Sequence, residues 1–256
     1  MINELSILAG IFGTVIGSFL NVLIHRLPLN QEFVSSRSKC PHCGDQIPAW
    51  YNIPILGFLI LRGKCRACHK RIHWRYPLVE LLMGLIFFFK FPADIEIVSI
   101  YSYVFVCGVS AALIVHFFID LEHRLLLDKI NIYLLMLILP YSVIFYAPAH
   151  WIIGAGLGFL GPLGISWAFY KIKGKVGLGG GDIKLWGVLG LMLGPAGIMT
   201  NIFFSSLLGS LIGIALIMKK RYQQDAGIPF GPFIIMVALF QIFFPGLIES
   251  LGLFGS

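Results

Sequence analysis

The chain has 256 residues, of which 58% are hydrophobic and only 12% are charged. Soluble domains average about 45–50% apolar and about 25% charged residues, so this composition excludes a soluble globular protein and indicates an integral membrane protein. The net charge of +7 needs no nucleic-acid partner, because membrane topology and attraction to anionic membrane lipid account for it.

Eight apolar stretches are candidates for transmembrane helices, which need about 20 residues, or fewer inside a bundle. They cover residues 5–24, 77–91, 97–119, 130–147, 150–170, 183–194, 197–218 and 230–248. The first lacks the basic start and small-residue cleavage site of a signal peptide, so we expect it to be retained. The break at Gly194-Pro195 leaves a re-entrant hairpin open. The pattern predicts an all-α polytopic membrane protein with about eight transmembrane helices.

Basic residues determine the predicted orientation. Eighteen of the nineteen lysine and arginine residues lie in 25–76, 120–129, 171–184 and 219–229, which fall on one side when the chain crosses eight times. Only Lys90 falls on the other side. The positive-inside rule makes the basic side cytoplasmic. Both termini then lie outside, and Asp120 and Asp182 lie at the cytoplasmic ends of their stretches.

Residues 25–76 form the only sizeable polar segment, between a first span at 1–24 and a membrane domain at 77–256. Two C-x-x-C pairs stand in it, made of Cys40, Cys43, Cys65 and Cys68. Doubled pairs at this separation suit tetrahedral thiolate coordination of zinc. The segment is too small for much of a core, so a structural metal would supply folding energy. The spacing predicts a small cytoplasmic zinc knuckle.

Two alternatives to the zinc knuckle remain. Disulfides are disfavoured because the predicted side is a reducing compartment. A redox C-x-x-C would need only one pair, and no βαβ pattern surrounds either. Cys107 lies inside an apolar stretch and is expected to be a small core residue. We expect no internal repeat in the chain.

Two aspartates lie at the ends of apolar stretches and are candidates for catalytic residues. Asp182 comes after Gly179-Gly180-Gly181, and Asp120 ends the run that starts at Val115. The structural alternative for Asp182 is an N-cap of a helix that begins at 183, with Lys184 neutralising it locally. Asp128 is a further aspartate nearby, and it is expected to be the N-cap of a helix over 129–147. For Asp120 the structural alternative is a residue at the boundary between an apolar stretch and the polar residues that follow it.

The functional interpretation is a carboxylate pair. Two neighbouring carboxyl groups do not both ionise easily, so one stays protonated while the other is charged. Such a pair can activate a water molecule and protonate a leaving amine, as peptide hydrolysis requires. Glycines 179–181 would leave room for an extended peptide beside Asp182. Pro229-Phe230-Gly231-Pro232 is expected to start the last span, and lining the same cleft is a second possibility.

Motifs along nearly the whole chain resemble those of the type IV prepilin peptidases, a family of polytopic aspartic proteases. The matching segments are Gly17–Pro28, the cysteine pairs with Asn52–Ile55 and Arg62–Lys64, Arg75–Glu80, Ile119–Asp128, Gly179–Lys184 and Ile228–Phe233. One departure is visible, since Leu127 stands before Asp128 where the family usually has proline.

The resemblance implies a bacterial inner-membrane enzyme with Asp120 and Asp182 as catalytic residues, supported by the loop residues Gly179, Gly180, Gly181 and Lys184. It implies that leader peptides of type IV prepilins or pseudopilins are cut on the cytoplasmic face. Methylation of the new amino terminus by S-adenosylmethionine is a second implied activity, because bifunctional members carry the cysteine domain. Gly63 and Glu80 are the candidate residues for methyl transfer.

An ion- or proton-coupled transporter is the competing function, since glycine-broken helices and membrane carboxylates suit that class too. A transporter would place its acids at mid-depth, whereas both aspartates here are predicted at the basic face.

Overall fold

The computed structural model describes residues 4–32, 38–175, 177–218 and 229–245. Within these ranges the chain is helical and contains no strand; its only β pairings are two isolated bridges, Lys39 with Gln46 and Lys64 with Arg71. The predicted all-α class is therefore confirmed for this part of the chain. The basic segment 219–228 and the last three residues of the predicted span 230–248 lie outside it.

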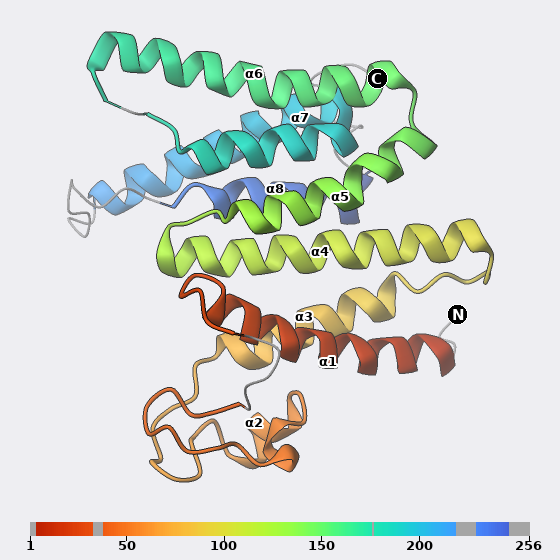
Figure 1. Ribbon diagram of the computed structural model, residues 1–256, viewed down its shortest axis with the longest axis vertical. Helices are drawn as coiled ribbons and strands as arrows, with labels where there is room; N and C mark the ends of the chain where they lie inside the picture. Colours follow the sequence, from red (N-terminus) through yellow and green to blue (C-terminus); the bar gives the residue numbers. More distant parts are fainter. Residues whose placement is uncertain (1–3, 33–37, 176, 219–228, 246–256) are drawn as a thin grey trace. The chain divides into compact units, whose positions relative to one another are not determined.

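Helices occupy every stretch that hydropathy selects, as Figure 1 shows. They are α1 (Glu4–Arg26), η1 (Ala49–Asn52), α2 (Leu56–Ile60), α3 (Arg75–Phe89), α4 (Ile97–His123), α5 (Asp128–Phe145), α6 (Pro148–Lys173), α7 (Gly180–Met218) and α8 (Gly231–Phe243).

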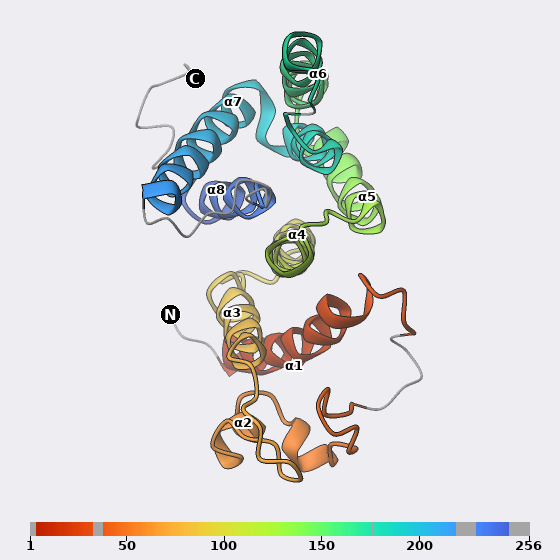
Figure 2. The same cartoon turned by 90° about the vertical axis from the view of Figure 1, so that its left-hand side faces the viewer.

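Five of the described helices are long and apolar enough to cross a membrane: α1, α4, α5, α6 and α7. Helices α3 and α8 are shorter. The 39-residue α7 is two helices joined at Gly194, whose φ of 67° and ψ of −175° are not helical, and Figure 2 shows the bend. The structure thus supports a polytopic membrane protein, and a total of eight crossings stays a prediction.

The chain divides into two compact units, residues 1–111 and 112–256, with the division inside α4. The predicted boundaries at 24 and 76 both fall within the first unit, and the three-part division remains a prediction.

In the first unit, α1 packs along α3. The contact is close because glycines line it: a Cβ at Gly17 would lie 2.6 Å from the Cα of Glu80, and one at Gly13 would lie 2.6 Å from the carbonyl oxygen of Met83. Asn21 donates from its side chain to the carbonyl oxygen of Tyr76 at 3.0 Å. Small residues let helix backbones approach where no water drives association.

In the second unit, α7 packs against α5, α6 and α8. Polar side chains fasten this group from within: the Trp186 indole donates to Asn201 Oδ1 at 2.9 Å, and the Asn201 amide donates to Gln241 Oε1 at 2.9 Å. Trp186 and Asn201 lie in the two halves of α7, and Gln241 lies in α8. The start of α7, which carries Asp182, is thereby held to α8.

Candidate active site and cysteine cluster

Asp120 lies in the last turn of α4 and is only 5% exposed. The chain reverses directly after it, where Arg124 takes a φ of 57° and its amide donates to the Asp120 carbonyl oxygen at 2.8 Å. The backbone amide of Gly231, the first residue of α8, faces the Asp120 carboxylate. Oxygen Oδ2 of the same carboxylate is buried and has no hydrogen-bond partner among the described residues. Asp120 therefore keeps one acceptor unused, which is costly unless a ligand or a proton satisfies it.

Asp182 is half-buried in the first turn of α7. The helix begins at Gly180, so Asp182 is its third residue, and the structural alternative of an N-cap before a helix at 183 does not hold. Its carboxylate accepts instead from the backbone amide of Gly179, one turn back. The acidic residue of a capping box makes the same bond, from the third helical position to the amide of the N-cap residue.

The second unit brings the two carboxylates close enough to interact electrostatically. Leu126, in the loop after α4, packs between the backbones that carry them. A Cβ at Gly181 would lie 2.8 Å from the Leu126 Cβ, and one at Gly231 would lie 3.2 Å from the Leu126 Cδ2. Glycines at both positions thus let the starts of α7 and α8 approach the loop. Sequence reasoning noted the motif around Gly231 but did not single out this residue or Leu126.

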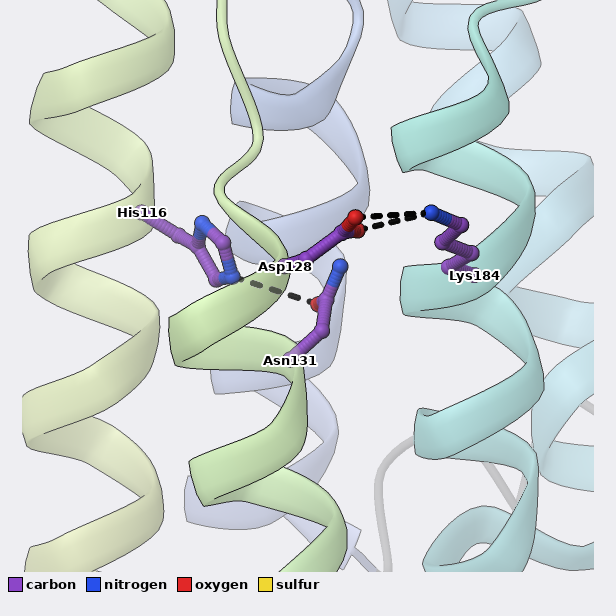
Figure 3. A network of polar contacts seen from close by, with 4 residues as sticks. All are labelled: His116, Asp128, Asn131 and Lys184. Atoms are coloured by element: carbon purple, nitrogen blue, oxygen red, sulfur yellow. Dashed lines mark hydrogen bonds and ion pairs between the residues drawn. The ribbon is translucent and has the colours of Figure 1, made fainter. Parts of the chain in front are cut away.

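Lys184 pairs with Asp128, not with the neighbouring Asp182. Its Nζ lies 2.8 Å and 3.0 Å from the two Asp128 carboxylate oxygens, as Figure 3 shows. Asp128 is itself the first residue of α5, where Leu127 takes the N-cap position without a side-chain bond. The N-cap interpretation of Asp128 was therefore wrong. The pair ties the first turn of α5 to the second turn of α7, and it leaves Asp182 without this counter-charge.

His116 lies one turn before Asp120 and is completely buried. Its Nε2 lies 3.2 Å from Asn131 Oδ1 on α5 (Figure 3). The bond joins the end of α4 to α5, so within the described structure His116 serves helix packing beneath the acids.

The four cysteines of 25–76 lie together in the first unit. The two C-x-x-C turns have the same backbone pattern: Cys40 donates to Asp45 and Cys65 to Lys70, each at 2.9 Å. The isolated bridges flank the turns at equivalent positions. The segments 38–47 and 63–72 therefore form a short structural repeat with a period of 25 residues, and the expectation of no internal repeat was wrong.

The four sulfurs lie within 4.8 Å of one another. The pairs Cys40–Cys68 and Cys43–Cys65 are 3.9 Å and 4.0 Å apart, and all four cysteines are free. A tetrahedron with zinc–sulfur bonds of about 2.3 Å has sulfur–sulfur edges of roughly 3.8 Å. The donor set and its spacing fit zinc, and the four cysteines form no disulfide with one another in this structure.

The thiols of the cluster differ in pKa. The amides of Cys68 and Ala67 donate to the Cys65 sulfur and lower the pKa of its thiol to about 7. At Cys43 a bond from the Asp45 amide lowers the pKa, but desolvation and the three other sulfurs outweigh it and raise that pKa to about 12. A bound cation would have to displace the remaining protons.

The two candidates for methyl transfer also lie in the first unit. Gly63 has a φ of 66° in the turn after α2, which explains the glycine by backbone conformation. Glu80 is buried in α3, and its Oε2 accepts from the Ile55 amide at 2.7 Å. These contacts give both residues a structural role, and a role in methyl transfer stays a prediction.

Two family models match the chain. The Bacterial Peptidase A24 N-terminal domain covers residues 11–93, and the Type IV leader peptidase family covers residues 105–214. The chain is also similar to proteins called prepilin leader peptidase/N-methyltransferase. Those of Aeromonas hydrophila, Stutzerimonas stutzeri and Pseudomonas aeruginosa are 36%, 34% and 32% identical to it, each over 88% of this chain and 85% of the relative. No solved structure matches significantly.

Proposed function

Because the chain belongs to the type IV leader peptidase family, we propose that it is a membrane aspartic endopeptidase that removes the leader peptides of type IV prepilins or pseudopilins. We propose Asp120 and Asp182 as its catalytic pair. The observation that carries the assignment is the meeting of the two buried or half-buried acids in one unit, with one oxygen of Asp120 left unpaired. The transporter alternative finds no support, since the relatives are peptidases by name.

The pair performs hydrolysis by dividing two tasks. A charged carboxylate takes a proton from water as the oxygen attacks the peptide carbonyl, and the neighbouring neutral carboxyl group stabilises the oxyanion and protonates the leaving amine. The amides of Gly179 and Gly231 hold the two side chains in place. Which aspartate is the base is a property of the coupled pair and not of either residue.

Replacing either aspartate by asparagine tests the assignment. Asp120→Asn or Asp182→Asn should lower the rate of leader cleavage by roughly 10²–10⁴-fold or more, because each removes one partner of the proton transfer. Glu122→Gln is the matched control, since it neutralises an exposed acid two residues from Asp120. Cleavage of a purified prepilin by the protein in detergent is the measurement. Normal cleavage by either asparagine variant would refute the catalytic pair.

Methyl transfer is the second proposed activity and rests on the relatives' printed names. S-adenosylmethionine would supply the methyl group for the new amino terminus. Gly63 and Glu80 remain the candidate residues. Incubating the enzyme with a prepilin and S-adenosylmethionine labelled in its methyl group should label the mature pilin only. We expect Glu80→Gln to abolish this label while cleavage continues, and unchanged labelling would remove Glu80 from the site.

The proposed location is the bacterial inner membrane, with the cysteine segment and the aspartates facing the cytoplasm and both termini outside. The one-sided distribution of lysine and arginine supports this orientation. Structural zinc held by Cys40, Cys43, Cys65 and Cys68 completes the proposal, because the four sulfurs already have the spacing of a zinc tetrahedron.

A further inference from the structure

The nine residues 53–61, Ile-Pro-Ile-Leu-Gly-Phe-Leu-Ile-Leu, contain no polar side chain although they belong to the cysteine segment. Of these nine residues only Gly57 is buried. Ile53, Leu56, Leu59 and Ile60 are between 45% and 63% exposed, and the nearby Trp50 is 74% exposed. A contiguous exposed apolar surface of this kind marks an interaction site. Neither peptide cleavage nor zinc binding uses it.

The backbone of this segment turns sharply at Ile55. Ile55 has a φ of 62° and a ψ of −51°, and the Leu56 amide donates to the Pro54 carbonyl oxygen at 2.6 Å, which defines a γ-turn of the rare positive-φ kind. For a β-branched residue this conformation is strained. Glu80 offsets part of the strain by accepting from the Ile55 amide at 2.7 Å. The turn is therefore held in place against α3.

This contact fixes the depth of the segment relative to α3. Glu80 follows Arg75, the first residue of α3, by five residues, or about 7–8 Å along the helix axis. The segment thus lies beside the second turn of α3 and not beyond its end, and in Figure 1 α2 lies below the first half of α3. If α3 crosses the membrane as predicted, Ile55 lies at the depth of about 5–10 Å that interfacial helices reach.

Charge favours a bilayer as the occupant of this surface. Residues 25–76 contain nine lysine and arginine residues and two acidic residues, a net charge of +7. Arg62 and Lys64 follow the apolar segment directly. Basic residues beside an apolar surface attract anionic lipid, and tryptophan prefers the headgroup level.

We propose that residues 53–61, together with Trp50, dock into the boundary between headgroups and acyl chains of an anionic bilayer. The apolar side chains enter the chain region and the basic residues contact the headgroups. The zinc knuckle is then held on the membrane surface beside α3 by lipid as well as by Glu80.

Fluorescence quenching of the full-length, zinc-loaded protein tests the proposal. The protein is placed in nanodiscs of phosphatidylcholine, with or without phosphatidylglycerol, whose chains are brominated near the headgroup. The difference between wild type and Trp50→Phe isolates the emission of Trp50 from that of the other tryptophans. We expect bromine to reduce this component about twofold, more strongly with phosphatidylglycerol, and the bilayer to shield it from aqueous iodide.

A matched pair of variants separates docking from folding. Leu59→Glu and Gln46→Glu each add one negative charge at an exposed position of the cysteine segment, but only Leu59 belongs to the apolar surface. Leu59→Glu should abolish the bromine quenching of Trp50 and Gln46→Glu should not, with equal zinc content in both. Quenching by iodide but not by bromine in the wild type would overturn the proposal. If Trp50 is shielded from iodide only when prepilin is added, the substrate occupies this surface, and the proposal of a bilayer is overturned as well.

Discussion

At the scale of single residues, Gly231 leaves no room for a side chain between its backbone and the Asp120 carboxylate. A Cβ at this position would lie 2.7 Å from Asp120 Oδ2 and 3.2 Å from its Cγ. Gly231 does not have a positive φ, so alanine fits its backbone and only the added methyl group conflicts. The glycine therefore serves the close approach of the α8 amide to the carboxylate.

Gly231→Ala should lower kcat for leader cleavage by roughly 10- to 100-fold, because misplacing a catalytic group by about 1 Å has an effect of that size. Gly156→Ala is the matched control, since its new Cβ would have no neighbour within 4 Å. Both variants are purified, checked by thermal unfolding and assayed with a prepilin. Equal kcat values would show that the space beside Asp120 is not needed.

At the scale of elements, the crossing of α6 and α7 determines where Asp182 lies. Gly154 and Gly158 stand one turn apart on α6, and a Cβ at either would collide with the α7 backbone, at Gly190 and Trp186 respectively. Gly156, between them, faces open space. This is the small-residue spacing that lets membrane helices touch along their backbones.

Gly154→Ala should destabilise the protein by about 1–3 kcal/mol, the usual cost of overpacking a close contact, whereas Gly156→Ala should leave stability unchanged or slightly higher. Thermal unfolding in one detergent, followed by tryptophan emission, compares the two variants. If both variants unfold at the wild-type temperature, the helices do not depend on this backbone contact.

For the whole molecule, the division of the chain separates the two chemistries. Cys40, Cys43, Cys65 and Cys68 lie in the first unit, and Asp120 and Asp182 lie in the second. Leu126, Gly179 and Gly231, which the described contacts place beside the aspartates, also belong to the second unit. We therefore expect the metal to matter for the fold of the first unit more than for hydrolysis.

Removing the metal should unfold residues 38–72 and leave leader cleavage largely intact. The double variant Cys40→Ser, Cys65→Ser should contain no zinc and should be cut by proteases within that segment, because two sulfurs alone do not hold the metal. Zinc analysis, limited proteolysis and the cleavage assay are run on the same preparation. Loss of cleavage to the level of Asp182→Asn would show that the second unit depends on the knuckle.

Much of this protein follows from its sequence. Hydropathy alone locates the helices, because a chain in lipid must satisfy its backbone hydrogen bonds within each segment and only apolar side chains tolerate that surrounding. The doubled C-x-x-C spacing locates the cysteine cluster, since two tight turns aim their sulfurs at one point. The motifs around Asp120 and Asp182 resemble those of the peptidase family to which the chain belongs. These signals are local, and local patterns are read directly from residue order.

The tertiary structure alone decided which groups meet. Lys184 has Asp182 as its near neighbour in sequence, yet it pairs with Asp128, 56 positions away. Gly231 reaches Asp120 across more than a hundred residues, and Ile55 reaches Glu80 through a γ-turn that no propensity favours. Such contacts depend on where glycines let two helices approach each other. The sequence of one helix does not determine this, because it also depends on the helix that packs against it. The sequence could therefore determine the helices, the cysteines and the two acids, whereas packing determined their partners.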